Sequence, residues 1–184
     1  KLLAEYRHDG LGRRIAKRVP TAYDGTNTPT VYTRWDYYDR QPWQVVQEFC
    51  ATAVAAANKE NAATALKTAY VWDERYIDAP VVRYYDSNGD QDFADADEVL
   101  YYAQDANYNV TALFDTSGTA RERYTYDPYG RATVYEGNWT ADGDGKSDFG
   151  NEILYCGYRY DPETGLYDVR LYRFSESGSF RPRS

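Results

Sequence analysis

Polar and apolar residues alternate along several short stretches of the chain. The alternation is clear in ARERYTY (120–126), where Glu122, Tyr124 and Tyr126 share one side and the arginines share the other. The stretches NVTALFD and GLYDVRLYRF show the same enrichment in β-branched and aromatic residues. A period of two is typical of a strand with two unlike faces. The pattern therefore predicts a sheet whose tyrosine rings cover at least one face that meets water.

An acidic motif separates these stretches and recurs along the chain. It reads Tyr, two residues, Asp, two residues, Gly, Arg in YRHDGLGR (6–13) and in YTYDPYGR (124–131). YAQDANYN (102–109) keeps the Tyr and the Asp, and YRYDPETG (158–165) delays the glycine by one residue. Aspartate at the first position of a type I turn accepts backbone N–H groups, and glycine takes the left-handed conformation that closes the turn. The motif therefore predicts repeated β-hairpins that must stack to bury apolar surface.

One segment, residues 48–69, differs from the repeats because it is rich in alanine and contains no tyrosine, glycine or proline. Alanine has the highest helix propensity, so we expect a helical insertion near 51–67. A solvated loop is the alternative, because the apolar stripe of this segment is weak. The predicted fold class is mainly β, with antiparallel hairpin repeats in a curled, shell-like sheet. The predicted segments are 1–47 (strands), 48–70 (insertion), 71–173 (second β region) and 174–184 (irregular tail).

Composition narrows the classes of function. The chain has 184 residues and a net charge of −8, which opposes binding to nucleic acid because phosphates repel such a surface. No apolar run reaches the length of a membrane span, so we expect no direct membrane insertion. Methionine is absent, even at position 1, which suggests a piece of a longer chain whose export signal would lie upstream. Cys50 and Cys156 have no metal-binding spacing, so we expect two half-buried free thiols, with a disulfide between them as the alternative.

The sharpest chemical candidate is DSNGDQDFADADE (86–98). Its oxygen-bearing residues match positions 1, 3, 5, 7 and 12 of a calcium-binding loop; they are Asp86, Asn88, Asp90, Asp92 and Asp97. This spacing predicts a structural Ca²⁺ site, the only cofactor that the sequence suggests. The alternative is an acidic hairpin tip between two strands, which its charge keeps soluble.

A second acidic run, DGDGKSD (142–148), offers Asp142, Asp144 and Asp148 as weaker calcium ligands. Lys146 stands where a further ligand would be needed. His8 is the single histidine and lies within a repeat beside its turn, so we expect no Ser-His-Asp or Cys-His site. No catalytic residue is predicted.

Three stretches, ERYTYDPYGRATVY, NEILYCGYRYDPETGLYDVR and YAQDANYNVTAL, resemble the YD-repeat, or Rhs, family and its repeat-associated core region. The resemblance covers Leu2–Arg18 and about Trp72–Arg170. It implies long sheets that spiral into a hollow shell, which in bacterial members encloses a C-terminal toxin or cargo. It also implies an aspartate-dependent self-cleavage, but no aspartate follows Asp168 here, so we expect none.

Two functions remain open at this point. The first is a non-enzymatic scaffold or shell segment of a large secreted or cell-surface Rhs protein, with the remainder of that chain and a toxin or adhesive domain as partners. The second is a module that binds carbohydrate or a surface protein through a tyrosine-rich face and a calcium-shaped loop.

Overall fold

The computed structural model describes residues 4–19, 31–39, 41–52, 65–170, 172–175 and 180–182. These residues form two antiparallel sheets and a single short 3₁₀ turn. The strands of the larger sheet are β1 (Glu5–His8), β2 (Arg14–Val19), β3 (Val31–Tyr37), β4 (Val45–Thr52), β5 (Ala65–Trp72), β6 (Pro80–Tyr85), β7 (Val99–Gln104), β8 (Val110–Phe114), β9 (Ala120–Tyr126) and β10 (Ala132–Glu136). The predicted mainly β fold with hairpin repeats is confirmed.

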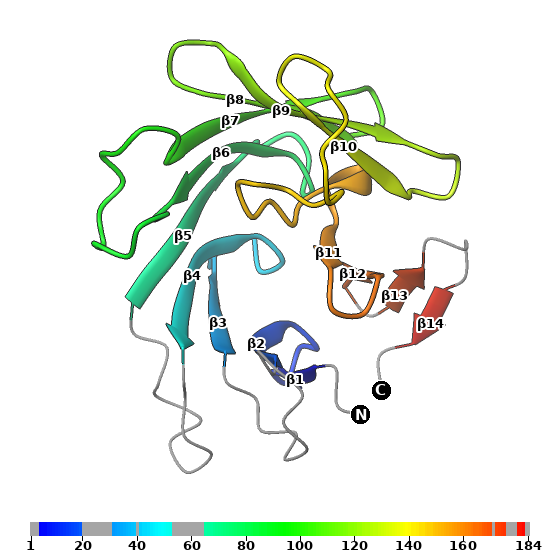
Figure 1. The fold of residues 1–184 in the computed structure, drawn as a ribbon. Coiled ribbons are helices and arrows are strands. Elements are labelled where there is room, and N and C mark those ends of the chain that lie inside the picture. The colour runs from blue at the N-terminus through cyan, green and yellow to red at the C-terminus, as the bar shows by residue number, and fades with distance from the viewer. Residues whose placement is uncertain are drawn as a thin grey trace, which may run out of the picture.

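Every strand of the larger sheet lies beside its neighbours in sequence, in the order β1 to β10. The sheet bends into an arc, as Figure 1 shows by the steady change of colour around its rim. The alternation predicted for 120–126 is confirmed: Glu122 and Tyr124 are buried, whereas Arg123 between them is half-buried and Thr125 after them is exposed.

Four hairpins turn through the same acidic corner, which begins at Asp9, Asp105, Asp115 or Asp127. In each corner one carboxylate oxygen accepts the N–H groups of the residues two and four positions later, at 2.8–3.0 Å. The aspartate carbonyl accepts the N–H of the residue three positions later, at 3.0 Å. The corner is thus a type I turn whose aspartate satisfies backbone donors that the sheet leaves free.

The fourth residue of each corner adopts the left-handed conformation. It is glycine in three corners, Gly12, Gly118 and Gly130, with φ between 78° and 85°. In the corner that lacks glycine, Tyr108 takes the same conformation with φ 61°. Its ring stacks on that of Tyr76, with 3.9 Å between the ring centroids, which offsets part of the strain.

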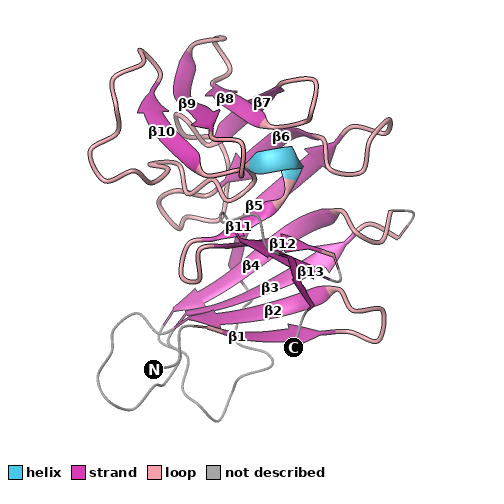
Figure 2. Cartoon of the chain, turned by 90° about the vertical axis from the view of Figure 1, so that its right-hand side faces the viewer, coloured by secondary structure: helices cyan, strands magenta, loops and turns pink. Residues whose placement is uncertain are grey.

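The smaller sheet contains β11 (Arg159–Asp161), β12 (Leu166–Val169), β13 (Tyr172–Ser175) and β14 (Phe180–Pro182), in that order. The 3₁₀ turn η2 (Tyr155–Gly157) precedes it. Figures 1 and 2 show this sheet on the open side of the arc, facing the concave surface of the larger sheet. The irregular tail predicted for 174–184 is wrong where β13 and β14 lie, because backbone pairing extends the sheet to both.

The helix predicted near 51–67 is wrong at both ends. Residues 51–52 complete β4, and residues 65–67 begin β5. These two strands pair with each other, for example Cys50 with Ala65. This pairing provides hydrogen bonds to the backbone N–H and C=O groups, which a helix would instead form within the segment. Residues 53–64 lie outside the described residues. β4 and β5 also run across the boundaries predicted at 47/48 and 70/71.

The core lies between the two sheets. The concave face of the larger sheet contributes Trp35, Tyr70, Leu100 and Leu113, and the smaller sheet contributes Tyr167, which has no exposed surface. Cys50 and Cys156 are free thiols, as expected. In the described part of the chain, no helix reaches the length and apolar character needed to cross a membrane.

Candidate functional site

A buried arginine joins the first hairpin to the smaller sheet. Arg14 of β2 donates to both carboxylate oxygens of Asp161 of β11, at 2.6 and 2.8 Å, and its Nη2 lies 2.8 Å from Asp168 of β12. The rings of Tyr6 and Trp35 lie 4.5 and 5.5 Å from the guanidinium carbon. Arg14 is 2% exposed and Asp161 is not exposed, so water does not screen this ion pair.

Asp161 is the corner aspartate of the fourth repeat, in which the glycine comes one residue late. Its carbonyl accepts the N–H groups of Thr164 and Gly165, at 3.0 and 2.9 Å. Its carboxylate binds Arg14, whereas the other four corner aspartates use theirs to hold their own turns. The delayed glycine therefore marks the one corner whose side chain serves a long-range contact.

A second group of charges lies beside the first. Glu152 is held between Lys17 Nζ, at 3.2 Å, and Arg159 Nη1, at 2.9 Å. The same Nη1 lies 2.5 Å from Glu48 of β4. Burial alone would raise the pKa of Glu152, but Lys17 and Arg159 outweigh that effect and lower the pKa to about 2. Glu152 is therefore ionised at neutral pH and acts as a counter-ion.

These charged groups hold the two sheets together. Asp161 and Asp168, the aspartates nearest to the family's expected cleavage region, are both bound to Arg14.

The predicted calcium loop follows β6, and its oxygens already accept backbone hydrogen bonds. Asp86 is buried, and its carboxylate accepts the N–H groups of Gly89 and Gln91 at 2.5 and 3.0 Å. Asp90 accepts the N–H of Asp92 at 3.0 Å. Asn88 donates to Asp90 at 2.9 Å, so these two side chains do meet.

Asp97, the fifth predicted ligand, lies apart from the others. Its Oδ2 is 2.6 Å from Nη2 of Arg121 on β9, so Asp97 pairs with a cation of the sheet. The structure therefore brings Asn88 and Asp90 together and directs Asp97 elsewhere. Calcium binding by Asp86, Asn88, Asp90, Asp92 and Asp97 stays a prediction.

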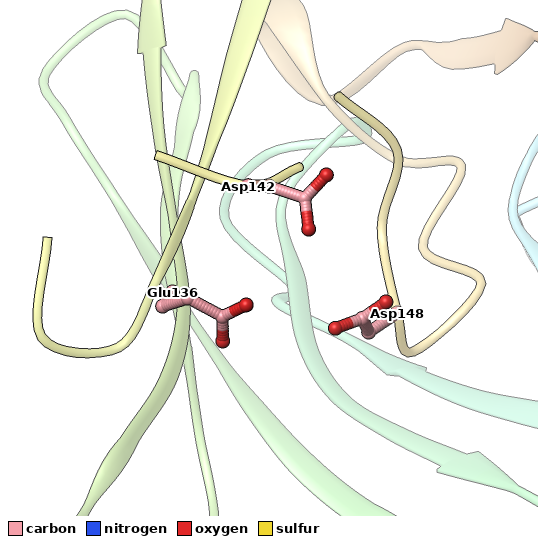
Figure 3. Close-up of side chains that lie close together, drawn as sticks. All are labelled: Glu136, Asp142 and Asp148. Atoms are coloured by element: carbon pink, nitrogen blue, oxygen red, sulfur yellow. The ribbon is translucent and has the colours of Figure 1, made fainter. Parts of the chain in front are cut away.

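The second acidic run forms a tighter group. Oxygens of Glu136, Asp142 and Asp148 all lie within 4.8 Å of one another, the one such acidic group among the described residues. Figure 3 shows their carboxylates around a common space, where the end of β10 meets the loop that follows it. Carboxylate oxygens are the ligands that Ca²⁺ prefers, but these side chains alone also fit a solvated acidic loop.

Glu136 was missed by the sequence prediction, which named Asp144 as the third member of this run. It faces Glu122 across the β9–β10 register, so its position follows from strand pairing. Sequence spacing along the loop could not reveal it. Asp142 accepts the N–H groups of Asp144 and Gly145, at 2.9 and 2.5 Å, as an ordinary turn aspartate does.

Most of the described tyrosines, from which a partner-binding face was predicted, are half-buried, and four are buried. Tyr32, Tyr70, Tyr124 and Tyr167 are 4% exposed or less. Tyr101, at 44%, keeps a substantial exposed surface on a strand. The rings mainly fill the space between the sheets, which is why so many can be accommodated in a small protein.

No family model matches the chain. The chain is 30% identical over 167 residues, 91% of its length, to the tRNA3(Ser)-specific nuclease WapA of Bacillus spizizenii. It is 36% identical over 67 residues, 36% of its length, to the tRNA nuclease WapA of Bacillus subtilis. It covers 5% and 3% of the length of these relatives, respectively.

This similarity to the Bacillus spizizenii protein extends over nearly the whole chain, which contains four acidic corners with the same hydrogen-bond pattern. The chain belongs to the YD-repeat, or Rhs, family. This YD-repeat chain has the same fold as part of TcdB2–TccC3 without its hypervariable C-terminal region (TM-score 0.58, 20% identity). It also matches part of the Photorhabdus luminescens Tc holotoxin pore (TM-score 0.61, 19% identity). Each match covers 94% of the YD-repeat chain and 7% of the larger chain.

Proposed function

We propose that the chain is a non-enzymatic scaffold segment of a large secreted or cell-surface protein, and that its curled sheet forms part of a shell. The shell would enclose or display a toxin or adhesive domain. One observation carries the proposal: ten strands follow one another around an arc whose concave face is the buried one. An arc built this way continues by adding hairpins at its edges and so can surround a volume.

The names of the relatives support a toxin domain that acts on RNA as the cargo. The Bacillus proteins are nucleases, and the chain covers 5% or less of their length, so the nuclease activity belongs to proteins with much additional sequence. A cargo that acts on RNA is compatible with a shell segment whose net charge is −8. Such a segment repels the phosphates of RNA and so does not bind the substrate of the cargo.

The test is protease protection of the complete protein that contains this segment. The enclosed domain should resist trypsin while the protein is folded, and should become sensitive after Arg14→Gln, which removes the arginine that ties the two sheets together. Arg75→Gln, a change in an exposed pair with Asp73, is the control and should leave protection intact. A domain that is cut equally fast in all three proteins would refute enclosure.

Calcium binding by the 86–98 loop remains part of this proposal and has its own test. Titration with Ca²⁺ should raise the melting temperature, and Asp90→Asn should remove the rise. Asp142→Asn is the matched change in the Glu136–Asp142–Asp148 group. If only Asp142→Asn removes the rise, the ion binds in that group and the loop prediction is wrong.

A further inference from the structure

Asn88 and Gly89 form the only Asn–Gly pair in the sequence, and both residues are exposed in the loop that follows β6. An asparagine loses its side-chain amide when the backbone nitrogen of the next residue attacks its Cγ and closes a five-membered imide ring. Glycine in the second position favours this attack, because no side chain shields its nitrogen. A Cβ added at Gly89 would meet nothing within 4 Å, so the surroundings leave space for the ring.

The attacking nitrogen already has a carboxylate beside its proton. The N–H of Gly89 donates to Oδ1 of Asp86 at 2.5 Å. Asp86 is 2% exposed, and its own N–H donates to the carbonyl of Lys67 on β5 at 3.0 Å. The sheet therefore holds the carboxylate in place while the Asn–Gly pair is exposed. A carboxylate in this position can accept the proton as the nitrogen attacks, which is the role of a general base.

The side chain of Asn88 is also held at both of its polar atoms. Its Oδ1 accepts the N–H of Asp90 at 2.9 Å, and a donor at this oxygen stabilises the negative charge that develops there during the attack. Its Nδ2 donates to carboxylate oxygens of Asp90 and Asp95 at 2.9 and 2.6 Å. Two carboxylates thus lie where the nitrogen leaves as ammonia and becomes a cation in water.

We propose that Asn88 deamidates in the folded chain, with Asp86 as the general base, and that this modification opens the 86–98 loop. The nitrogen of Gly89 forms a bond to Cγ of Asn88 and passes its proton to Asp86. The bond from Cγ to Nδ2 then breaks, and the nitrogen takes up that proton and leaves as ammonia. Water hydrolyses the imide at one of its two carbonyls, which leaves aspartate or isoaspartate at position 88. The reaction needs no other reactant and depends neither on the shell function nor on ion binding.

The modification reverses the hydrogen-bonding character of position 88. Its amide donates to Asp90 and Asp95 before the reaction, whereas a carboxylate accepts only. Two hydrogen bonds are therefore lost, and a third negative charge stands beside two others. The contact between residues 88 and 95 joins the two ends of the loop, so its loss should free the segment between them. Because deamidation is slow and irreversible, the loop should open as the protein ages.

The experiment follows the mass of the peptide that contains Asn88 while the chain is kept at neutral pH with EDTA, which removes divalent cations. Deamidation should be faster in the folded chain than in the same chain unfolded in guanidinium chloride, where Asp86 is no longer held beside Gly89. The modified protein carries one more negative charge, so anion exchange separates it. Hydrogen exchange of its amides in 87–97 should be faster than in the unmodified protein. Equal or slower deamidation in the folded chain, or unchanged hydrogen exchange, would overturn the proposal.

Three variants test the roles of the residues. Asp86→Ala should slow deamidation about tenfold, less than the usual contribution of a general base, because a carboxylate is a weak base. Asp92→Ala removes an exposed carboxylate of the same loop and should deamidate at the wild-type rate. Asn88→Gln should not react, since glutamine would have to close a six-membered ring. Equal rates in Asp86→Ala and the wild type would refute the role of Asp86. The comparison of folded with unfolded wild type needs no substitution, so it decides the question even if Asp86→Ala does not fold.

Discussion

Gly118 and Gly130 occupy the same position in two acidic corners but have different surroundings. Both are left-handed, with φ 82° and 85°. A Cβ added at Gly118 would meet nothing within 4 Å, whereas one at Gly130 would lie 2.8 Å from the ring of Tyr155. The corner thus sets one requirement, the backbone conformation, and the packing around Gly130 adds another.

Alanine substitution separates the two requirements. Gly118→Ala should lower the free energy of unfolding by about 1 kcal/mol, the cost of a left-handed alanine. Gly130→Ala should lower it by about 2–4 kcal/mol, because the methyl group also displaces the Tyr155 ring. Urea unfolding of the two variants measures both values. Equal losses would show that the ring moves aside without cost.

The stabilisation that Glu152 provides should depend on pH. Its pKa is about 2 in the folded chain and about 4.3 in an unfolded one, so its ionised form favours folding. This contribution is complete above about pH 5 and is lost as the pH falls toward 2.

Glu152→Gln tests this dependence, because glutamine does not titrate. The gap in unfolding free energy between the wild type and Glu152→Gln should be constant from pH 5 to 8 and shrink between about pH 4.5 and 2. Glu74→Gln, a change in an exposed loop, controls for the loss of net charge. A gap of constant size down to pH 2 would contradict the assigned role of Lys17 and Arg159.

The sequence predicted the residues that act locally and missed those that act across the fold. The turn aspartates and glycines follow from spacing alone, since their partners lie within four residues. Even the corner with Tyr108 was recognised from its Tyr and Asp. The pairing of Arg14 with Asp161 joins residues 147 positions apart, and no local pattern encodes it.

At the scale of elements, strand pairing decided the structure of the two described ends of the alanine-rich segment. Alanine favours a helix by less than 1 kcal/mol per residue over most residues, and context overrides this preference. Thr68 faces Glu48 and Tyr85 in neighbouring strands, so the segment gains cross-strand contacts on both sides. Its ends therefore form β4 and β5, a result that depends on partners distant in the sequence.

The smaller sheet should detach from the larger one when Arg14 is neutralised. Arg14→Gln leaves the buried Asp161 with only Lys17, 3.7 Å away, as a counter-ion, so we expect a loss of about 3 kcal/mol, the lower end of the range for a broken buried pair. Hydrogen exchange of the amides in β11 and β12 should accelerate, while amides in β8 and β9 keep their protection.

Arg75→Gln is the matched control for this variant, because it breaks a pair whose arginine side chain is 86% exposed. Its cost should stay below about 1 kcal/mol. Slow exchange of β11 and β12 in Arg14→Gln would show that apolar contacts such as those of Tyr167 suffice to hold the sheet.

At the scale of the whole molecule, the larger sheet has two unlike edges. β1 pairs only with β2 among the described strands. β10 is partly covered, because Tyr135 bridges to Ala141 and Val134 accepts the N–H of Asp142 at 3.2 Å. An uncovered strand edge invites pairing with another chain. The edge at β1 is therefore the one expected to associate.

Light scattering of the separate chain tests this expectation. The average mass should rise with protein concentration, because each open β1 edge can pair with another. Association through strands should persist in high salt, since backbone hydrogen bonds are not screened as surface ion pairs are. A compact monomer at all concentrations would contradict an open edge.

The order of strands β1 to β10 also has a consequence for synthesis. Each strand of the larger sheet pairs with the strand synthesised just before it. The earlier strands can therefore fold while the ribosome is still synthesising the later ones. The contact between Arg14 and Asp161 must wait until the smaller sheet emerges, 147 residues later. Assembly of this protein is thus progressive along its length and ends when the distant contacts of the smaller sheet form.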